Sequence, residues 1–186
     1  MRYRSLLILT LAVVGITPVD GQTQRSLVIF HTADIHGGVS ARPARWHSAD
    51  PNRLIGGFAA LSRVIQRESG AYALLDSGDI FQGTPEGNIT KGSIVISAMN
   101  RLGYDAMAIG NHEYDYGENN LRSLKVQARF PFLASNIFNK RNGKLADYAL
   151  PAVVLHIGNV RVVVIGIATQ TTRTSTLPAN VAHLDF

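Results

Sequence analysis

Residues 104–117 read YDAMAIGNHEYDYG and hold the pattern that decides the fold. The stretch opens with a short apolar run, which is typical of a buried β-strand. The run ends at Gly110, and amide, imidazole and carboxylate side chains follow it directly. A loop of this composition after a buried strand predicts polar groups gathered at the carboxyl end of that strand.

The same arrangement occurs twice earlier in the chain. Residues 72–83 read YALLDSGDIFQG, and residues 27–37 read LVIFHTADIHG. Each apolar run again leads into Asp or His beside glycine, a residue that permits sharp turns and close approach of a ligand. Because ligands of open α/β sheets bind outside the carboxyl ends of the strands, we expect the three loops to form one site.

The remaining pattern predicts strands and helices in alternation. Strands are expected at Leu27–His31, Tyr72–Leu75, Tyr104–Ile109 and Phe132–Ser135, helices at Gly56–Glu68, Ser93–Leu102 and Gly117–Ala128, and long loops at Thr32–Arg53 and Ser77–Gly92. Two further apolar runs, Val153–Ile157 and Val160–Ile167, flank a Gly-Asn pair that favours a hairpin turn. The alternation predicts an α/β domain with a partly parallel sheet, and the hairpin adds antiparallel pairing.

The first 21 residues have the layout of a secretory signal peptide. Arg2 and Arg4 precede an apolar run, Pro18 breaks the run, and Gly21 offers a small residue for cleavage. A membrane-spanning helix needs about 20 apolar residues, more than this run has. The alternatives are an uncleaved membrane anchor or a buried first helix. The preferred interpretation predicts that residues 22–186 act outside the cytoplasm, without a stable membrane anchor.

The composition narrows the function classes. Of 186 residues, 46% are hydrophobic and 17% are charged, which excludes a disordered chain. The absence of cysteine excludes disulfides, thiolate zinc sites and a cysteine nucleophile. The net charge of +5 is modest and spread along the chain, so no nucleic-acid partner is expected.

The residue types in the three loops indicate a metal site. Mixed carboxylates and imidazoles suit Zn, Mn, Fe or Co better than Ca. Asp34 and His36 are two residues apart, so both side chains face the same way from a strand end. Asp and Asn beside Gly are also common turn residues, so a single loop would say little. Three successive loops of this kind are much harder to explain as turns.

The order Asp-x-His, Gly-Asp, Gly-Asn-His-Glu resembles that of the calcineurin-like metallophosphoesterases. Residues 76–85 and 110–117 are similar to the 5'-nucleotidase branch, which includes UDP-sugar hydrolases and 2',3'-cyclic nucleotide phosphodiesterases. The resemblance implies an α/β sandwich of mixed β-sheets flanked by helices. Residues 22–186 would be the N-terminal part of the catalytic domain, incomplete at the C-terminus. The family's later histidine ligands and its C-terminal nucleotide-binding domain are not expected within this chain.

The resemblance also implies a role for each loop residue. Asp34, His36 and Asp79 are then ligands of one divalent metal, and Asp79 bridges to a second metal that Asn111 also binds. The two ions, Zn, Mn, Co or Fe, would activate a water for attack on phosphorus. His112 would be the catalytic histidine and Asp115 the carboxylate that orients it. The alternatives are a helix-start residue for His112 and a helix N-cap for Asp115.

These roles predict metal-dependent hydrolysis of phosphate esters of extracytoplasmic nucleotides by a secreted or periplasmic protein. The expected partner is a nucleotide or another phosphate-ester substrate. Enzyme alternatives are a UDP-sugar hydrolase, a cyclic nucleotide phosphodiesterase and a thiosulfohydrolase. A different alternative is a non-catalytic, weakly metal-binding secreted fragment, because the chain carries few of the family's metal ligands.

Several other polar residues receive structural predictions. Asp76 is expected to accept hydrogen bonds within its loop, Glu113 to cap or brace a turn, and Asn136 to hydrogen-bond backbone near the site. His31 and His156 lie in predicted strands and are expected to be packed.

Overall fold

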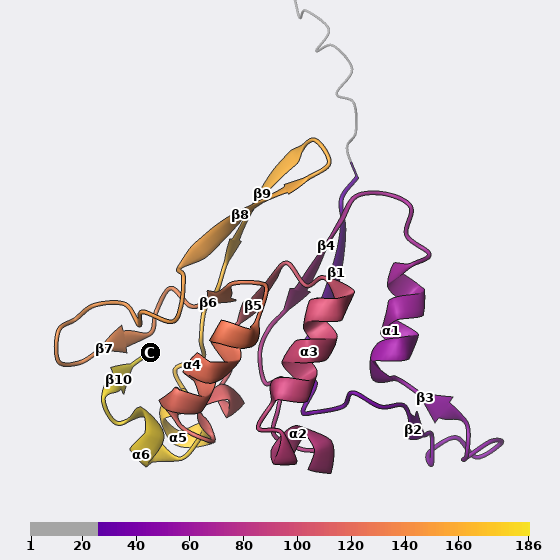
Figure 1. Ribbon diagram of the computed structural model, residues 1–186, viewed down its shortest axis with the longest axis horizontal. Helices are drawn as coiled ribbons and strands as arrows, with labels where there is room; N and C mark the ends of the chain where they lie inside the picture. Colours follow the sequence, from indigo (N-terminus) through magenta and orange to yellow (C-terminus); the bar gives the residue numbers. More distant parts are fainter. Residues whose placement is uncertain (1–25) are drawn as a thin grey trace, which may run out of the picture.

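The computed structural model describes residues 26–186, so the predicted signal peptide lies outside the described residues. Its central sheet consists of four parallel strands in the order β1-β4-β5-β6 (Figure 1). The strands are β1 Val28–Thr32, β4 Tyr72–Asp76, β5 Ala106–Ala108 and β6 Phe132–Leu133. The predicted parallel α/β sheet is therefore confirmed, with each strand within a few residues of its expected range.

Three long helices lie on one side of this sheet (Figure 1). They are α1 Gly57–Ile65, α3 Ser93–Leu102 and α4 Glu118–Gln127, close to the predicted ranges. The strands alternate, so Phe30 and Leu74 face the helices from paired positions on β1 and β4. The core between the two layers is continuous and includes Leu74, Val95, Met99, Met107, Leu121, Leu124 and Phe132.

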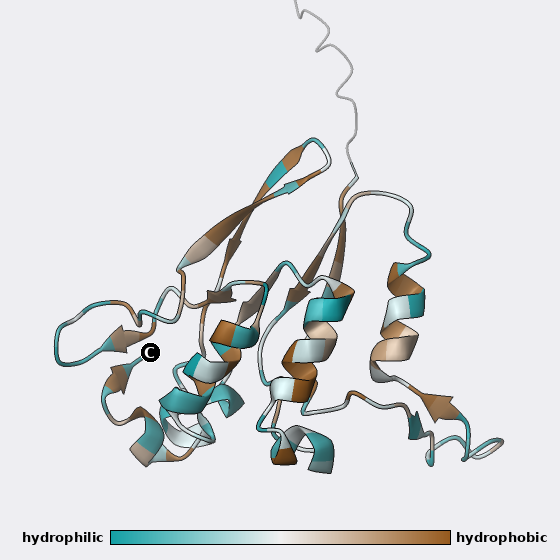
Figure 2. Cartoon of the chain, viewed as in Figure 1, coloured by the Kyte–Doolittle hydropathy of each residue, from teal (hydrophilic) through white to brown (hydrophobic). Residues whose placement is uncertain are grey.

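The predicted hairpin is present and extends away from the helical layer (Figure 1). It consists of β8 Ala152–Ile157 and β9 Val160–Ile165, paired antiparallel with Val154 opposite Val163. A parallel bridge between Leu133 and Leu150 connects its base to β6. Both strands are rich in apolar residues (Figure 2), and Val154 and Val163 are 51% and 60% exposed.

The sequence pattern did not predict the short elements. They are β2 Arg42–Pro43, β3 Leu54–Ile55, α2 Pro85–Ile89, the 3-10 helix η1 His112–Tyr114, β7 Phe138–Asn139, α5 Thr172–Ser175, α6 Pro178–Val181 and β10 Leu184–Asp185. Hydrophobic periodicity needs more residues than these elements have. Within the described part of the chain, no helix has the length and apolar character needed to cross a membrane.

Two histidine predictions are wrong. His31 is exposed because β1 turns Phe30 and Thr32 toward the helices and His31 toward the opposite face. Its Nε2 lies 2.6 Å from the Ser77 hydroxyl. His156 is also exposed, because it lies on the hairpin, where little else covers the strand.

Candidate metal centre

The loops after β1 and β4 are joined by backbone hydrogen bonds. The amide of Asp34 donates to the Gly78 carbonyl at 3.1 Å, and the amide of His36 donates to the Asp79 carbonyl at 3.0 Å. The amide of Gly37 continues the series to Ile80 at 2.8 Å. The two loops therefore hold each other, as expected for strand ends that meet at one edge of the sheet.

Glycines bring the loop after β5 against the loop after β4. A Cβ atom on Gly78, at φ +94°, would lie 2.4 Å from the Gly110 nitrogen. A Cβ atom on Gly110 would lie 2.3 Å from Oδ1 of Asp79. Neither position has room for a side chain, so the glycines are required for the close approach of these two loops.

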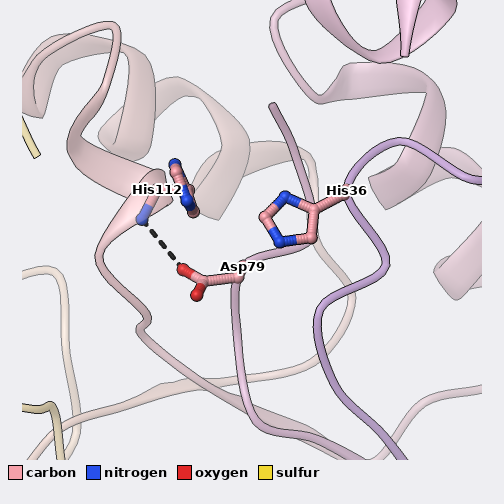
Figure 3. A group of neighbouring side chains, drawn as sticks. All are labelled: His36, Asp79 and His112. Carbon is pink, nitrogen blue, oxygen red and sulfur yellow. Dashed lines mark hydrogen bonds between the residues drawn. The ribbon is translucent and has the colours of Figure 1, made fainter. Parts of the chain in front are cut away.

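His36, Asp79 and His112 come together from the three loops (Figure 3). One ligand-type atom from each lies within 4.8 Å of the others. The two imidazole ring centroids are 4.9 Å apart. The backbone amide of His112 donates to Oδ1 of Asp79 at 2.9 Å, the dashed line in Figure 3. This trio is the geometric centre of the site.

The other two predicted ligands are Asp34 and Asn111, which are not members of this trio. Oδ1 of Asp34 is 3.8 Å from Nε2 of His36, and the Asp34 side chain is 67% exposed. The Asn111 amide nitrogen donates to the Ser175 carbonyl at 3.1 Å, which leaves its side-chain oxygen as the atom for a metal. Their roles as ligands, like the division into two metal positions, stay predictions.

Both imidazoles are oriented by a hydrogen bond at Nδ1. The Gln82 carbonyl lies 2.6 Å from Nδ1 of His36, and Oδ2 of Asp115 lies 2.6 Å from Nδ1 of His112. A carbonyl only accepts, so Nδ1 of His36 is the donor, and Nε2 is the ring nitrogen left for a metal. Metal-binding histidines commonly have such a partner on the second ring nitrogen.

Backbone strain is concentrated at the same place. Among the described residues, the non-glycine residues with positive φ are Asp34 at 52°, His36 at 49°, Asp79 at 56° and Lys91 at 48°. Three of these four are predicted metal ligands. Left-handed backbone costs free energy in L-residues, and such residues cluster at functional sites.

Glu113 braces its own turn, as predicted, and also binds the loop after β4, which was not predicted. Its side chain is fully buried and accepts backbone hydrogen bonds from Gly110 at 2.7 Å, Asp79 at 2.9 Å and Ile80 at 3.0 Å. Burial raises the pKa of Glu113 to about 8, against the lowering effect of these donors. One carboxylate thus satisfies amides from both loops.

Asp76 accepts hydrogen bonds within its loop, which confirms its predicted role. It receives the Thr32 hydroxyl at 2.6 Å and the Gly78 amide at 2.7 Å. Burial raises the pKa of Asp76 to about 6. Asn136 also behaves as expected, because its side chain bonds both the carbonyl and the amide of Ala168 at 2.8 Å.

Asp115 is not a helix N-cap. Helix α4 begins after Gly117, which has no side-chain cap, and Asp115 instead contacts His112. Its second oxygen accepts the Thr176 hydroxyl at 2.8 Å. Thr176, like Ser175 beside Asn111, was missed by the sequence reasoning, because a threonine or serine 60 residues from the loop carries no local signal.

The donor set fits a divalent transition metal or zinc. Carboxylate oxygens and neutral imidazole nitrogens are ligands that Zn, Mn, Fe and Co share. His112 has the geometry of either a ligand or a proton donor, since its Nε2 is the ring nitrogen left free by Asp115.

Comparison with known proteins places the chain in context. The family model for the calcineurin-like phosphoesterases matches residues 27–178. A snake venom 5'-nucleotidase from Gloydius brevicauda is 35% identical over 166 residues, which are 86% of this chain and 28% of the venom protein. A 5'-nucleotidase from Vibrio parahaemolyticus is 32% identical over 168 residues, 90% of this chain and 29% of that protein.

A solved structure shows the same fold. The 5'-nucleotidase precursor from Thermus thermophilus aligns with a TM-score of 0.73 and 32% identity, over 86% of this chain and 31% of that chain. The chain therefore spans about a third or less of the length of these relatives.

Proposed function

The chain belongs to the calcineurin-like phosphoesterase family, and we propose that it carries metal ligands of a 5'-nucleotidase-like active site that hydrolyses its substrate with metal-activated water. The substrate would be a phosphate ester of a nucleotide outside the cytoplasm. The observation that carries the proposal is the trio His36, Asp79 and His112, whose ligand-type atoms lie within 4.8 Å of one another. The similar venom, Vibrio and Thermus proteins, all named as 5'-nucleotidases, support the reaction class.

Asp34, His36, Asp79 and Asn111 would hold the metal ions. When bound, divalent ions would neutralise charge at the phosphoryl group and activate water for attack. The other residues of the chain hold these metal-ligand side chains in position. Nδ1 of His36 is tied to the Gln82 carbonyl, and the strained Asp79 backbone is tied to both neighbouring loops.

His112 would act on the leaving group. Its Nδ1 faces Asp115 at 2.6 Å, so a proton carried on Nε2 is free to pass to the departing ester oxygen. The Asp115 carboxylate holds the ring in place through its contact with Nδ1.

Export from the cytoplasm belongs to the same proposal. It is supported by the predicted signal peptide and by the similarity to a venom protein. A reporter fusion to residues 1–21 would test it. Export of the reporter supports the proposal, and cytoplasmic retention contradicts it.

Metal titration and phosphate release together test the site. We expect the purified chain to bind Mn, Zn or Co by calorimetry, and the Asp79→Asn variant to lose at least tenfold in affinity, because a ligand is lost. His112→Ala should lower phosphate release from a nucleoside monophosphate. Asp50→Asn, an exposed carboxylate in the loop between β2 and β3, is the matched control. Metal-dependent hydrolysis that survives Asp79→Asn would contradict the assigned site.

A second candidate is metal binding without turnover. It is favoured by the small number of grouped donors in the described residues. One weak metal site and no phosphate release would support it, whereas two tight sites would contradict it. Parallel assays with a UDP-sugar, a 2',3'-cyclic nucleotide and a thiosulfonate substrate separate the enzyme alternatives.

A further inference from the structure

A segment near the end of the chain holds the loop after β5. Residues 175–180 run from the last residue of α5 into α6, and both helices lie below α4 in Figure 1. The Ser175 carbonyl accepts the side-chain amide of Asn111 at 3.1 Å. The side-chain amide of Asn180 donates to the carbonyls of Tyr114 at 2.8 Å and Asp115 at 3.2 Å. Three positions of the loop are thereby tied to one distant segment.

Thr176 makes the contact closest to the chemistry. Its hydroxyl donates to Oδ1 of Asp115 at 2.8 Å, while Oδ2 of Asp115 faces Nδ1 of His112 at 2.6 Å. Thr176 is 8% exposed, and the side chains of Asp115 and His112 are 14% and 29% exposed. Water therefore has little access to replace either contact.

The two hydrogen bonds use the two oxygens of one carboxylate. Rotation of the Asp115 carboxylate would break at least one of them, because the hydroxyl and the imidazole lie on different oxygens. A fixed carboxylate in turn fixes the plane of the His112 ring and keeps the proton on Nδ1. The ring of His112 then keeps a nitrogen within 4.8 Å of ligand-type atoms of His36 and Asp79.

We propose that Thr176 is a positioning residue that orients His112 through Asp115. The same segment, residues 175–180, orients the Asn111 side chain through a hydrogen bond to the Ser175 carbonyl. The hydrogen-bonded chain is a property of the fold, and its consequence for catalysis rests on the proposed function above.

The first test is an NMR measurement on the full chain without metal. In ¹⁵N-labelled protein, we expect a His112 Nδ1–H resonance shifted downfield by its hydrogen bond, and a slowly exchanging Thr176 hydroxyl proton. Thr176→Val removes the hydroxyl at nearly constant volume, and should shift or broaden the Nδ1–H resonance. Thr176→Ser restores the donor and should restore the resonance.

Thr174→Val is the matched control. Thr174 is exposed, and its hydroxyl donates only within its own helix, to the Thr171 carbonyl at 3.1 Å. This variant should leave the His112 resonance unchanged.

The second test is kinetic. In metal-loaded chain, we expect Thr176→Val to lower kcat about tenfold with KM nearly unchanged, since partners that orient a catalytic group typically contribute factors of 10 to 100. Thr176→Ser should recover most of the loss. A purely structural role for Thr176 would change the amount of folded protein without this split between kcat and KM.

The outcomes separate the two proposals. A His112 resonance and kcat that are unchanged in a folded Thr176→Val chain would overturn the positioning role. A chain that hydrolyses no phosphate ester with any metal would overturn the proposed function, while the NMR result still decides the hydrogen-bonded chain. If Thr176→Val does not fold, the wild-type hydroxyl proton decides, because rapid exchange of that proton would contradict the contact.

Discussion

Glu113 accepts hydrogen bonds from three backbone amides of the ligand-bearing loops and has no ion-pair partner among the described residues. A buried carboxylate costs free energy unless hydrogen bonds satisfy it, and here three backbone amides do so. The same bonds fix Asp79 and Gly110 relative to each other. The side chain thus links protein stability to the geometry of the site.

Glu113→Gln should weaken the link between the loops after β4 and β5. A glutamine offers one oxygen and two N–H donors where the wild type offers two oxygens, so at least one backbone amide loses its partner. Each unsatisfied buried group costs about 1–3 kcal/mol, and we expect a decrease of about 2–4 kcal/mol in the free energy of unfolding by urea.

Glu86→Gln, on the half-buried α2, is the control for the chemistry of the substitution and should change stability little. An unchanged unfolding midpoint for Glu113→Gln would show that the three amides do not depend on the carboxylate.

Asp76 predicts a pH dependence of stability. Burial raises its pKa from 3.8 to about 6, so the folded state binds more protons than the unfolded state between these values. The stabilising contribution of Asp76 to the free energy of unfolding is fully present below pH 4 and is lost as the pH rises through 6. Two pKa units correspond to about 3 kcal/mol.

The Asp76→Asn variant removes this titration. Relative to wild type, its free energy of unfolding should increase between pH 4 and pH 7, by up to about 3 kcal/mol in a chelating buffer. Asp50→Asn should show no such trend. A difference between D76N and wild type that is independent of pH would mean that Asp76 titrates normally in the folded chain.

At the scale of single elements, helix α3 has a C-terminus that depends on backbone conformation alone. Gly103 follows the helix at φ 76° and ψ 47°, and its amide donates to the Met99 carbonyl at 3.1 Å. A Cβ atom there would meet nothing within 4 Å. Any cost of substitution is therefore a cost of left-handed backbone.

Gly103→Ala should lower the free energy of unfolding by about 1 kcal/mol. Gly103→Asn should cost less, because asparagine tolerates the left-handed region better than alanine. Gly78→Ala provides the contrast, since its Cβ would lie 2.4 Å from the Gly110 nitrogen. In thermal unfolding, Gly103→Asn should be the least destabilising of the three variants, Gly103→Ala intermediate and Gly78→Ala the most destabilising. Equal costs for Gly103→Ala and Gly78→Ala would contradict the crowding at the loops.

The short elements also explain where the site gets its rigidity. Helix α2 has five residues, yet its N-cap Thr84 accepts the Gly87 amide at 3.0 Å and donates to the Gly37 carbonyl at 2.8 Å. This side chain ties the loop after β4 to the loop after β1. Elements too short to show periodicity therefore do much of the positioning.

At the scale of the whole molecule, the helical layer and the hairpin differ sharply in burial. The parallel sheet and its three helices enclose a continuous core, whereas the hairpin, whose strands are rich in apolar residues (Figure 2), leaves Val154, Val163 and Ile165 exposed. Exposed apolar surface of this kind promotes association.

We expect the purified chain to self-associate through the hairpin. Val154→Thr combined with Val163→Thr replaces a cross-strand apolar pair on the exposed face and keeps β-branched residues in the strands. Sedimentation velocity should show less concentration-dependent association for this double variant, with little change in unfolding. Val162→Thr, on the less exposed face, is the control. A wild-type chain that stays monomeric at all concentrations would contradict the prediction.

The sequence by itself determined the parallel α/β sheet and the three long helices. Strong apolar runs and helical periodicity act over short distances along the chain, so they are visible without a structure. It also placed the ligand-type residues at strand ends, and the sheet brings His36, Asp79 and His112 within 4.8 Å of one another.

Only the tertiary structure decided how those side chains are held. The Gln82 carbonyl holds the His36 imidazole, and Thr176 holds the His112 imidazole through Asp115. Asp34 lies beside His36 with most of its side chain exposed. These contacts join segments up to about 65 residues apart, and polar residues in loops have no periodicity to reveal them. Their partners are chosen by how the packed core brings the loops together, which no local pattern encodes.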